Sequence, residues 1–311
     1  MLDFYVDAEQ RRALLRALEA GAGEAFAEIQ LRRADGRGGK DLENVELELA
    51  LGLVHPRPRE HEDLGAVGRR LGTARDIPLN VGGTMIPGYD ARPEAQGRYP
   101  IVLAISGFTG VNEHHRDVVR RFAHAGYYAI APELFHREGG MQGKAFPELA
   151  KISGAIGRKQ YLGDLTAAAD FAKQQAWARA DRLGVTGFCG GGALTLHFSA
   201  EYPGVTAAVP WYGHVKRVYN DAPGVDAFAI ASKIKAPVLG LYGDADQGIP
   251  TPDVKAFEAE LRKTNPNVEF VLYPDAPHAF FSDDRPQVYR KDAAEDAWKR
   301  CLAFFDKHLK A

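Results

Sequence analysis

From about residue 77 onward, short apolar stretches alternate with longer stretches whose apolar residues recur at helical spacing. The short stretches are rich in β-branched residues and predict strands over residues 99–106, 127–134, 182–188, 205–213, 236–243 and 267–274. The longer stretches predict helices over residues 113–125, 159–175, 191–202, 252–263 and 290–309. An antiparallel hairpin is expected over residues 77–93, at the edge of the sheet. This alternation predicts an α/β fold with a mostly parallel central sheet flanked by helices.

The first 75 residues differ from the rest of the chain. Residues 6–33 have helical spacing, with Asp7 as a cap and a glycine break, and "ADGRGGKD" is typical of a loop. That loop lacks the first glycine of a phosphate-binding loop and the Ser or Thr that would follow Lys40. We therefore expect a helical extension over residues 1–75 and an α/β domain over residues 76–311. The extension is expected to pack on the main domain or on a second subunit, so a homodimer is a candidate assembly.

The composition is that of an ordinary globular protein, with 311 residues, 45% hydrophobic and 26% charged. A net charge of −2 gives no reason to expect nucleic acid or an anionic membrane as partner. Two cysteines cannot form a disulfide framework, and Cys301 lies in an amphipathic closing helix where it is expected to pack. The sequence has no signal-peptide pattern and no apolar run of membrane-spanning length, so a cytoplasmic protein is expected.

Cys189 stands at the junction between a strand-like and a helix-like stretch, within "GVTGFCGGGALTL". A residue on such a sharp turn needs small neighbours, which Gly187 and Gly191 supply. The pattern is that of a nucleophile elbow, G-x-S-x-G, with cysteine in place of serine. The alternative for this stretch is a buried structural cysteine beside a glycine-rich turn.

A thiol nucleophile needs a base within hydrogen-bond reach and a third group that orients the base. In folds with this elbow the acid and then the histidine follow the nucleophile, each on a loop after a later strand. "DADQGIP" follows one predicted strand and offers Asp244 and Asp246 as acids. "DAPHAFF" follows the next and offers His278 as the base. Asp246 is the preferred acid, because it lies further past the strand end, where the chain can turn toward the histidine.

An oxyanion hole needs two backbone N–H groups aimed at the developing charge. One is expected from Gly190, which follows the nucleophile at a helix N-terminus where the helix dipole also favours negative charge. The other is expected from the loop "GFTGVN" after the first predicted parallel strand, with Phe108 as the donor.

Four stretches together carry a resemblance: "GFTGVNEHHRDVVRRFAHAGYYAIAPELF", "GFCGGG", "YGDADQGIP" and "YPDAPHAFFSDDRP". Over about residues 77–311 the chain resembles the dienelactone hydrolase family of α/β-hydrolases. The resemblance implies a Cys-Asp-His triad of Cys189, Asp246 and His278 and an ester or lactone hydrolase of the carboxymethylenebutenolidase type, without a cofactor. It implies that the thiolate attacks the acyl carbon and that the histidine protonates the leaving alkoxide. The same histidine then activates water to cleave the thioester.

Two positions depart from the family pattern. The family glutamate of the first loop is replaced by Gly107. The arginine that holds the carboxylate of dienelactone is replaced by Ser282, and the nearest arginine is Arg285. The carboxylated dienelactone is therefore not implied as the substrate. Without the glutamate, we expect the resting Cys189 to be partly ionised already, unless Glu133 takes the place of the missing side chain.

Several other residues are candidates for the substrate pocket. Tyr212 ends a predicted strand beside the elbow, and Phe281 follows the candidate histidine, with simple core packing as the alternative for both. His136 and Arg137 follow a strand at the carboxyl edge of the sheet, where ligands of open α/β sheets bind. Solvated loop residues are the alternative for this second pair.

No metal site is expected. "NEHHRD" (residues 112–117) contains two adjacent histidines, but it opens a helix with Asn112 as the cap. Adjacent side chains on a helix point away from each other, so the two rings are not expected to share a ligand.

Two other functions compete with the hydrolase. Glutamine amidotransfer also uses a cysteine elbow, but it needs a later His-x-Glu pair, and here His136 and Glu138 precede Cys189. A non-catalytic binding module usually lacks a triad residue, and all three are present here. The sequence therefore predicts a cysteine-dependent hydrolase whose partner is a small-molecule ester or lactone.

Overall fold

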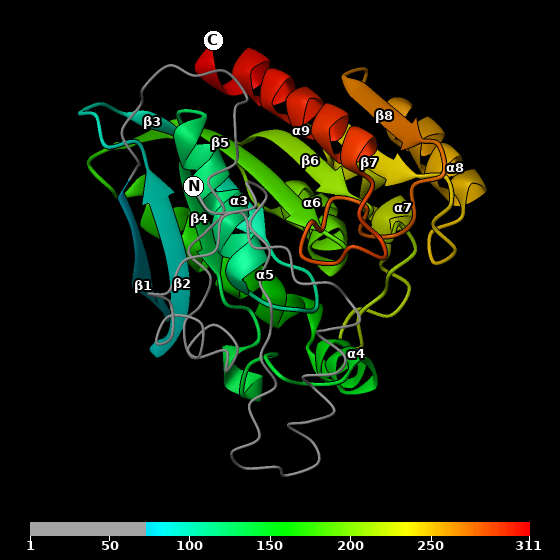
Figure 1. The fold of residues 1–311 in the computed structure, drawn as a ribbon, viewed down its shortest axis with the longest axis horizontal. Helices are drawn as coiled ribbons and strands as arrows, with labels where there is room; N and C mark the ends of the chain where they lie inside the picture. The colour runs from blue at the N-terminus through cyan, green and yellow to red at the C-terminus, as the bar shows by residue number, and fades with distance from the viewer. Residues whose placement is uncertain (1–72) are drawn as a thin grey trace, which may run out of the picture. The chain divides into compact units, whose positions relative to one another are not determined.

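The structure is a computed structural model that describes residues 73–311. Its centre is an eight-stranded sheet in the order β1-β2-β4-β3-β5-β6-β7-β8 (Figure 1). The strands are β1 (Thr73–Val81), β2 (Thr84–Arg92), β3 (Tyr99–Ile105), β4 (Tyr128–Pro132), β5 (Ala178–Phe188), β6 (Val205–Trp211), β7 (Val238–Gly243) and β8 (Val268–Tyr273). From β4 to β8 in this order, neighbouring strands pair in parallel. The hairpin is antiparallel: β1 pairs with β2, and β2 pairs antiparallel with β4. This is the predicted α/β-hydrolase fold.

The N-terminal hairpin lies at the sheet edge, as predicted. β1 and β2 are joined through Gly82 and Gly83, whose φ angles of 58° and 92° favour glycine. Asn80 Oδ1 accepts a 2.8 Å hydrogen bond from the Gly83 N–H and closes the turn. β1 already begins at Thr73, inside the segment that the sequence assigned to the extension. The helical extension itself lies outside the described residues and stays a prediction.

The helices follow strands β3 to β8 along the chain, and the last of them, α9, comes after β8. They are α3 (Glu113–His124), α4 (Phe146–Ala155), α5 (Arg158–Lys173), α6 (Gly190–Glu201), α7 (Ala227–Ile230), α8 (Thr251–Arg262) and α9 (Lys291–Phe305). The predicted helices 113–125, 159–175, 191–202, 252–263 and 290–309 correspond to α3, α5, α6, α8 and α9 with its continuation. The sequence pattern missed α4 and α7, which are short. No helix in the described part of the chain is both long and apolar enough to cross a membrane.

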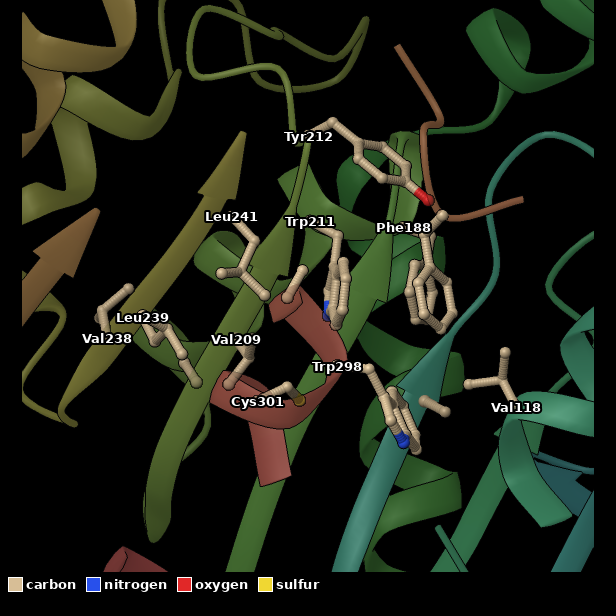
Figure 2. Close-up of a cluster of buried hydrophobic side chains, with 14 of the residues drawn as sticks. Val118, Phe188, Val209, Trp211, Tyr212, Val238, Leu239, Leu241, Trp298 and Cys301 are labelled. Atoms are coloured by element: carbon tan, nitrogen blue, oxygen red, sulfur yellow. The ribbon is translucent and has the colours of Figure 1, made fainter. Parts of the chain in front are cut away.

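Successive side chains of the central strands point to opposite faces of the sheet, so the hydrophobic core lies on both faces. In β3, Val102 and Ala104 join one buried cluster, and Leu103 and Ile105 join the other. The first cluster contains apolar residues of α3 and α9, and the second contains those of α5 and α6. Figure 2 shows part of the first cluster, where the buried Cys301 thiol lies among apolar side chains.

The parallel strands bring six connecting loops to one edge of the sheet. Because β3 to β8 all run in the same direction, their carboxyl ends meet there. The loops after β3, β5, β7 and β8 carry the candidate catalytic residues identified in the sequence. The fold therefore collects residues that are far apart in the chain.

Candidate active site

Cys189 occupies a strained turn between β5 and α6. Its φ of 57° and ψ of −117° are sparsely populated for a residue with a side chain. Close packing leaves no room for side chains on either flank: a Cβ on Gly187 would lie 2.2 Å from the Gly191 carbonyl oxygen. A Cβ on Gly191 would lie 2.2 Å from the Ile105 oxygen. The glycines thus permit a turn that leaves the thiol partly exposed at the end of the strand.

His278 and Asp246 are joined by a short hydrogen bond. The His278 Nδ1 lies 2.7 Å from Asp246 Oδ2, and the carboxylate is almost completely buried. The other oxygen, Oδ1, accepts hydrogen bonds from the N–H groups of Gly248 (2.9 Å) and Ile249 (3.1 Å). Both oxygens are therefore held, and the imidazole is oriented by a fixed carboxylate.

The neighbouring carboxylate has a different role. Asp244 Oδ1 accepts a 2.7 Å hydrogen bond from the Asp275 N–H, in the loop that leads to His278. Asp275 has a φ of 53°, so this bond stabilises an unfavourable backbone conformation. Asp246 contacts the ring, and Asp244 braces the loop that carries it.

Cys189 and His278 perturb each other's ionisation. Burial opposes the charged thiolate, but the hydrogen bond and charge of His278, the Gly190 backbone and Arg217 outweigh it and lower the pKa of Cys189. Burial also opposes the charged imidazole, but Asp246 and Cys189 raise the pKa of His278 to about 10. Both shifts favour a thiolate beside an imidazolium.

The loop after β3 lies directly against the nucleophile. A Cβ on Gly107 would lie 3.2 Å from Cys189 Cβ and 3.8 Å from its Sγ, so a side chain here would begin at the thiol. The ring of Phe108 lies over Gly190, where a Cβ would be 2.9 Å from Phe108 Cε1. The two expected oxyanion donors thus belong to residues in contact with each other beside the nucleophile.

The Glu133 carboxylate stabilises this loop through a hydrogen bond to its backbone. Its Oε2 accepts a 2.8 Å hydrogen bond from the Val111 N–H, and its Oε1 accepts a 3.1 Å bond from the Phe135 N–H. A Cβ on Gly110 would lie 2.8 Å from the carboxylate. Burial raises the pKa of Glu133, although both backbone bonds oppose that shift. Its two oxygens are bonded to backbone and make no contact that replaces the missing glutamate at Gly107.

The candidate substrate contacts are dispersed. Tyr212, at a φ of 36°, is buried with its ring centroid 5.2 Å from that of His278. Phe281 is buried in the core and stacks on Phe188. Arg137 donates a 2.7 Å bond to the buried Asp164, whereas His136 is exposed on the same turn. Of these four, Tyr212 is the one with a direct contact to the Cys189–His278–Asp246 group.

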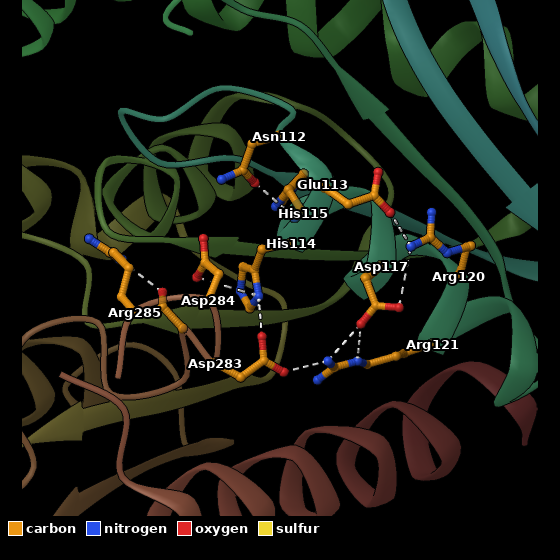
Figure 3. A network of polar contacts seen from close by, with 11 residues as sticks. Asn112, Glu113, His114, His115, Asp117, Arg120, Arg121, Asp283, Asp284 and Arg285 are labelled. Carbon is orange, nitrogen blue, oxygen red and sulfur yellow. Dashed lines mark hydrogen bonds and ion pairs between the residues drawn. The ribbon is translucent and has the colours of Figure 1, made fainter. Parts of the chain in front are cut away.

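The two adjacent histidines of α3 point to different partners, as expected. His115 is buried with Nε2 3.2 Å from the Ala104 oxygen. His114 Nδ1 lies 2.8 Å from Asp283 and 3.8 Å from Asp284 (Figure 3). These last three groups lie close enough together to surround an ion. However, Asp283 also accepts a 2.6 Å bond from Arg121, so the cluster already has a cation of its own.

Sequence reasoning missed Arg217, which lies in the loop after β6. It lines a cleft of about 390 Å³ together with Phe108 and His214. Its Nη1 would lie 2.9 Å from a Cβ on Gly190, the residue that follows the nucleophile. The basic run "HVKR" (residues 214–217) just past a carboxyl-edge strand was the signal that could have found it.

Known proteins share this architecture. The dienelactone hydrolase family matches residues 86–309. A protein of Methylorubrum extorquens described as "Putative carboxymethylenebutenolidase" is 40% identical over 237 residues, which cover 75% of this chain and 79% of that protein. One of Escherichia coli K12 with the same description is 41% identical over 234 residues, 73% of this chain and 84% of that protein.

A solved structure agrees. The crystal structure of a "Putative Dienelactone Hydrolase" from Klebsiella pneumoniae superposes with a TM-score of 0.72 at 39% identity, over 75% of this chain and 98% of that chain. These matches support a hydrolase and give no support to an amidotransferase or to a binding module. The chain belongs to the dienelactone hydrolase family of α/β-hydrolases, and it is a hydrolase of lactones or esters.

Proposed function

We propose that this hydrolase acts through Cys189 as nucleophile, His278 as general base and acid, and Asp246 as the group that orients the histidine. The observation that carries the proposal is the 2.7 Å contact between His278 and Asp246, next to a cysteine on a strained elbow. The lowered pKa of Cys189 supports a nucleophile that is ready at neutral pH, because the thiolate is the reactive form.

The reaction proceeds in two halves. The Cys189 sulfur forms a bond to the acyl carbon, and the carbonyl electrons move to the oxygen, which the N–H groups of Gly190 and Phe108 stabilise. The carbon–oxygen bond to the leaving group then breaks, and His278 gives its proton to the departing alkoxide. In the second half the neutral histidine takes a proton from water, the resulting hydroxide attacks the thioester, and the carboxylic acid leaves as the thiolate is restored.

The proposed substrate is a small-molecule lactone or ester, and no cofactor takes part in these steps. The relatives are described as carboxymethylenebutenolidases, which supports a lactone among the substrates. The position of the dienelactone-binding arginine is Ser282, whose hydroxyl accepts a 2.8 Å bond from Arg285. We therefore propose that the recognition of the natural substrate differs from that of the dienelactone-cleaving enzymes.

Three proposals concern the whole protein. We propose a cytoplasmic enzyme without a nucleic-acid partner, supported by the net charge of −2. We propose that residues 1–75 form a helical extension to a hydrolase domain over residues 76–311, and that they contribute to assembly and not to the chemistry. A homodimer is the proposed assembly, and the mass of the full chain measured by light scattering tests it: a monomer at micromolar concentration contradicts it.

The central experiment is hydrolysis of 4-nitrophenyl acetate by the wild type and by Cys189→Ala. Release of nitrophenolate should fall to background in the variant, because the acyl group has no acceptor. Cys301→Ala is the matched control, since this cysteine is fully buried among apolar residues and takes no part in the chemistry. Turnover that survives in Cys189→Ala would contradict the proposed nucleophile.

A further inference from the structure

We infer that Arg217 forms an anion-binding subsite beside the nucleophile and that this subsite selects acyl groups that carry a carboxylate. The inference rests on the proposed function, because it assumes that the acyl group is attached to Cys189. It assigns recognition of the anion to the loop after β6, and not to the loop after β8, where Ser282 stands in place of the family arginine.

The guanidinium is placed at the nucleophile's own helix terminus. Its Nη1 lies where it would meet a Cβ on Gly190 at 2.9 Å, so the positive charge borders the first residue of α6. The same charge contributes to the lowered pKa of Cys189. A ligand that binds Arg217 therefore lies beside Gly190, the residue that follows Cys189.

Fixed contacts hold the guanidinium in position. Its carbon lies 5.3 Å from the ring centroid of Phe108 and 5.0 Å from that of Tyr219. Its Nη2 donates to Ser153 Oγ at 3.0 Å and to the Ser153 carbonyl at 3.4 Å. The buried Ser153 is itself tied to Tyr161, whose hydroxyl donates to the Ser153 carbonyl at 3.1 Å. Such preorganisation lowers the entropy lost when a ligand binds.

None of the described residues neutralises the charge of Arg217. Within residues 73–311, no carboxylate forms an ion pair with it, and none of the cleft-lining residues is an Asp or a Glu. The neighbouring Lys216 lines the same cleft, but its Nζ is paired with Asp253 at 2.7 Å. A half-buried guanidinium without a counter-ion is a good receptor for a carboxylate, which its planar fork can bind through two hydrogen bonds.

The rest of the cleft favours an apolar body on the ligand. Phe108, Ala150 and Val218 contribute to its lining, and Val218 is 52% exposed. His214 adds no fixed charge, because burial and the nearby His278 lower its pKa. The cleft therefore fits an acyl chain with an apolar segment that ends in a carboxylate.

The test compares two esters of equal chain length, mono-4-nitrophenyl glutarate and 4-nitrophenyl pentanoate. The readout is the ratio of their kcat/KM values, because any general loss, such as a weaker thiolate, divides out. In Arg217→Gln the anionic-to-neutral ratio should fall about 10- to 100-fold, as expected for a lost hydrogen-bonded charge. Arg217→Lys should keep part of the preference, since it keeps the charge but not the fork.

Arg98→Gln is the matched control. Arg98 precedes β3 at the amino ends of the parallel strands and donates to the Ala178 carbonyl, so its loss should leave the ratio unchanged. In the wild type, raising the salt concentration from about 0.05 to 0.5 M should weaken the preference for the anionic ester, because salt screens exposed charges.

Each outcome decides the inference. A ratio that does not change in Arg217→Gln would overturn it, as would an equal loss of both esters in a correctly folded variant, which would indicate a structural role. If the wild type cleaves neither ester, the proposed function fails. Calorimetric titration with glutarate then still tests the subsite, because binding does not need turnover. Equal affinity for glutarate in wild type and Arg217→Gln would overturn the inference in that case too.

Discussion

The loops that meet at Cys189 form two regions with different electrostatics. In the loops after β7 and β8, the two carboxylates next to the histidine both have partners: Asp246 is held at both oxygens, and Asp244 binds the backbone of Asp275. In the loops after β3 and β6, Gly107 has no side chain and Arg217 has no counter-ion among the described residues. We call the loops after β7 and β8 the closed region, because a proton can move there between fixed partners. We call the loops after β3 and β6 the open region, because the charge of Arg217 there remains available for a ligand.

The comparison also separates what is shared with the family from what is particular to this chain. The proposed triad keeps the three residue types that the resemblance implies, and the two departures from the family pattern concern the resting partner of the thiol and the anion of the substrate. Proton transfer tolerates little change in geometry, because the groups must stay within hydrogen-bond reach. Substrate recognition can move to another loop of the same edge.

The largest expected effect tests the closed region. His278→Ala should lower kcat/KM by about 10² to 10⁴, because the general base is lost. Asp246→Asn should also be strongly impaired, since the amide cannot stabilise the imidazolium. Asp244→Asn is the matched control and should be affected less, because that carboxylate contacts backbone. Steady-state kinetics with 4-nitrophenyl acetate measures all three, and a larger loss in Asp244→Asn would reverse the assignment.

The second prediction compares the two cysteines. Burial alone raises the pKa of Cys301 well above its usual value, whereas His278 and Arg217 help to lower that of Cys189. Iodoacetamide should therefore modify Cys189 rapidly at pH 7 and leave Cys301 unmodified in the folded enzyme. Mass spectrometry of the tryptic peptides measures both rates.

The pH dependence of this alkylation shows in which direction the pKa of Cys189 is shifted. The lowered pKa means that the thiolate persists as the pH falls below the usual cysteine range of about 8.5, and alkylation slows only below the shifted value. Alkylation of Cys189 that rises only around 8.5 would show that the resting thiol is protonated.

The third prediction concerns a side chain introduced at Gly107, next to the nucleophile. In Gly107→Glu the Cβ of the new side chain would lie 3.2 Å from Cys189 Cβ, and its carboxylate would disfavour the nearby thiolate through charge repulsion. A rise of about one pKa unit corresponds to about a tenfold slower alkylation at a pH below the pKa. Gly107→Gln is the control of similar size without the charge. Equal rates in the two variants would show that steric crowding, and not charge, is the cause.

The smallest expected effect concerns the ion pairs between α3 and Asp283 in the loop after β8, shown in Figure 3. Burial opposes ionisation of Asp283, but His114 and Arg121 outweigh it and lower the pKa of this carboxyl. Asp283→Asn should reduce the free energy of unfolding at pH 7 by about 1 kcal/mol, measured by urea denaturation.

The sign of its pH dependence follows from the lowered pKa. The stabilisation from Asp283 is fully present above the unfolded-state pKa of about 3.9 and is lost as the pH falls through the lower folded-state value. The difference between wild type and Asp283→Asn should therefore shrink below pH 4. A difference that stays constant down to pH 2 would exclude an ionic origin.

The sequence by itself determined the order of strands and helices along the chain and the edge of the sheet at which the proposed catalytic residues lie. These features depend on local signals: hydrophobic periodicity for the strands, glycine pairs for the turn and the elbow, and Asn112 as the cap of α3. The loops that carry Cys189, Asp246 and His278 could be placed for the same reason, because each directly follows a recognisable strand. The short helices α4 and α7 were missed, since ten and four residues carry too little periodicity.

Only the tertiary structure decided which side chains meet. Arg217 reaches Ser153 across 64 residues, and Glu133 reaches Val111 across 22 residues. Phe281 turns into the core and Arg137 turns toward Asp164, although their positions in the sequence are as close to the catalytic edge as that of Tyr212. Such contacts depend on the relative placement of separate loops and on which polar groups must be paired when buried. A local pattern carries neither kind of information, because both are properties of the packed chain.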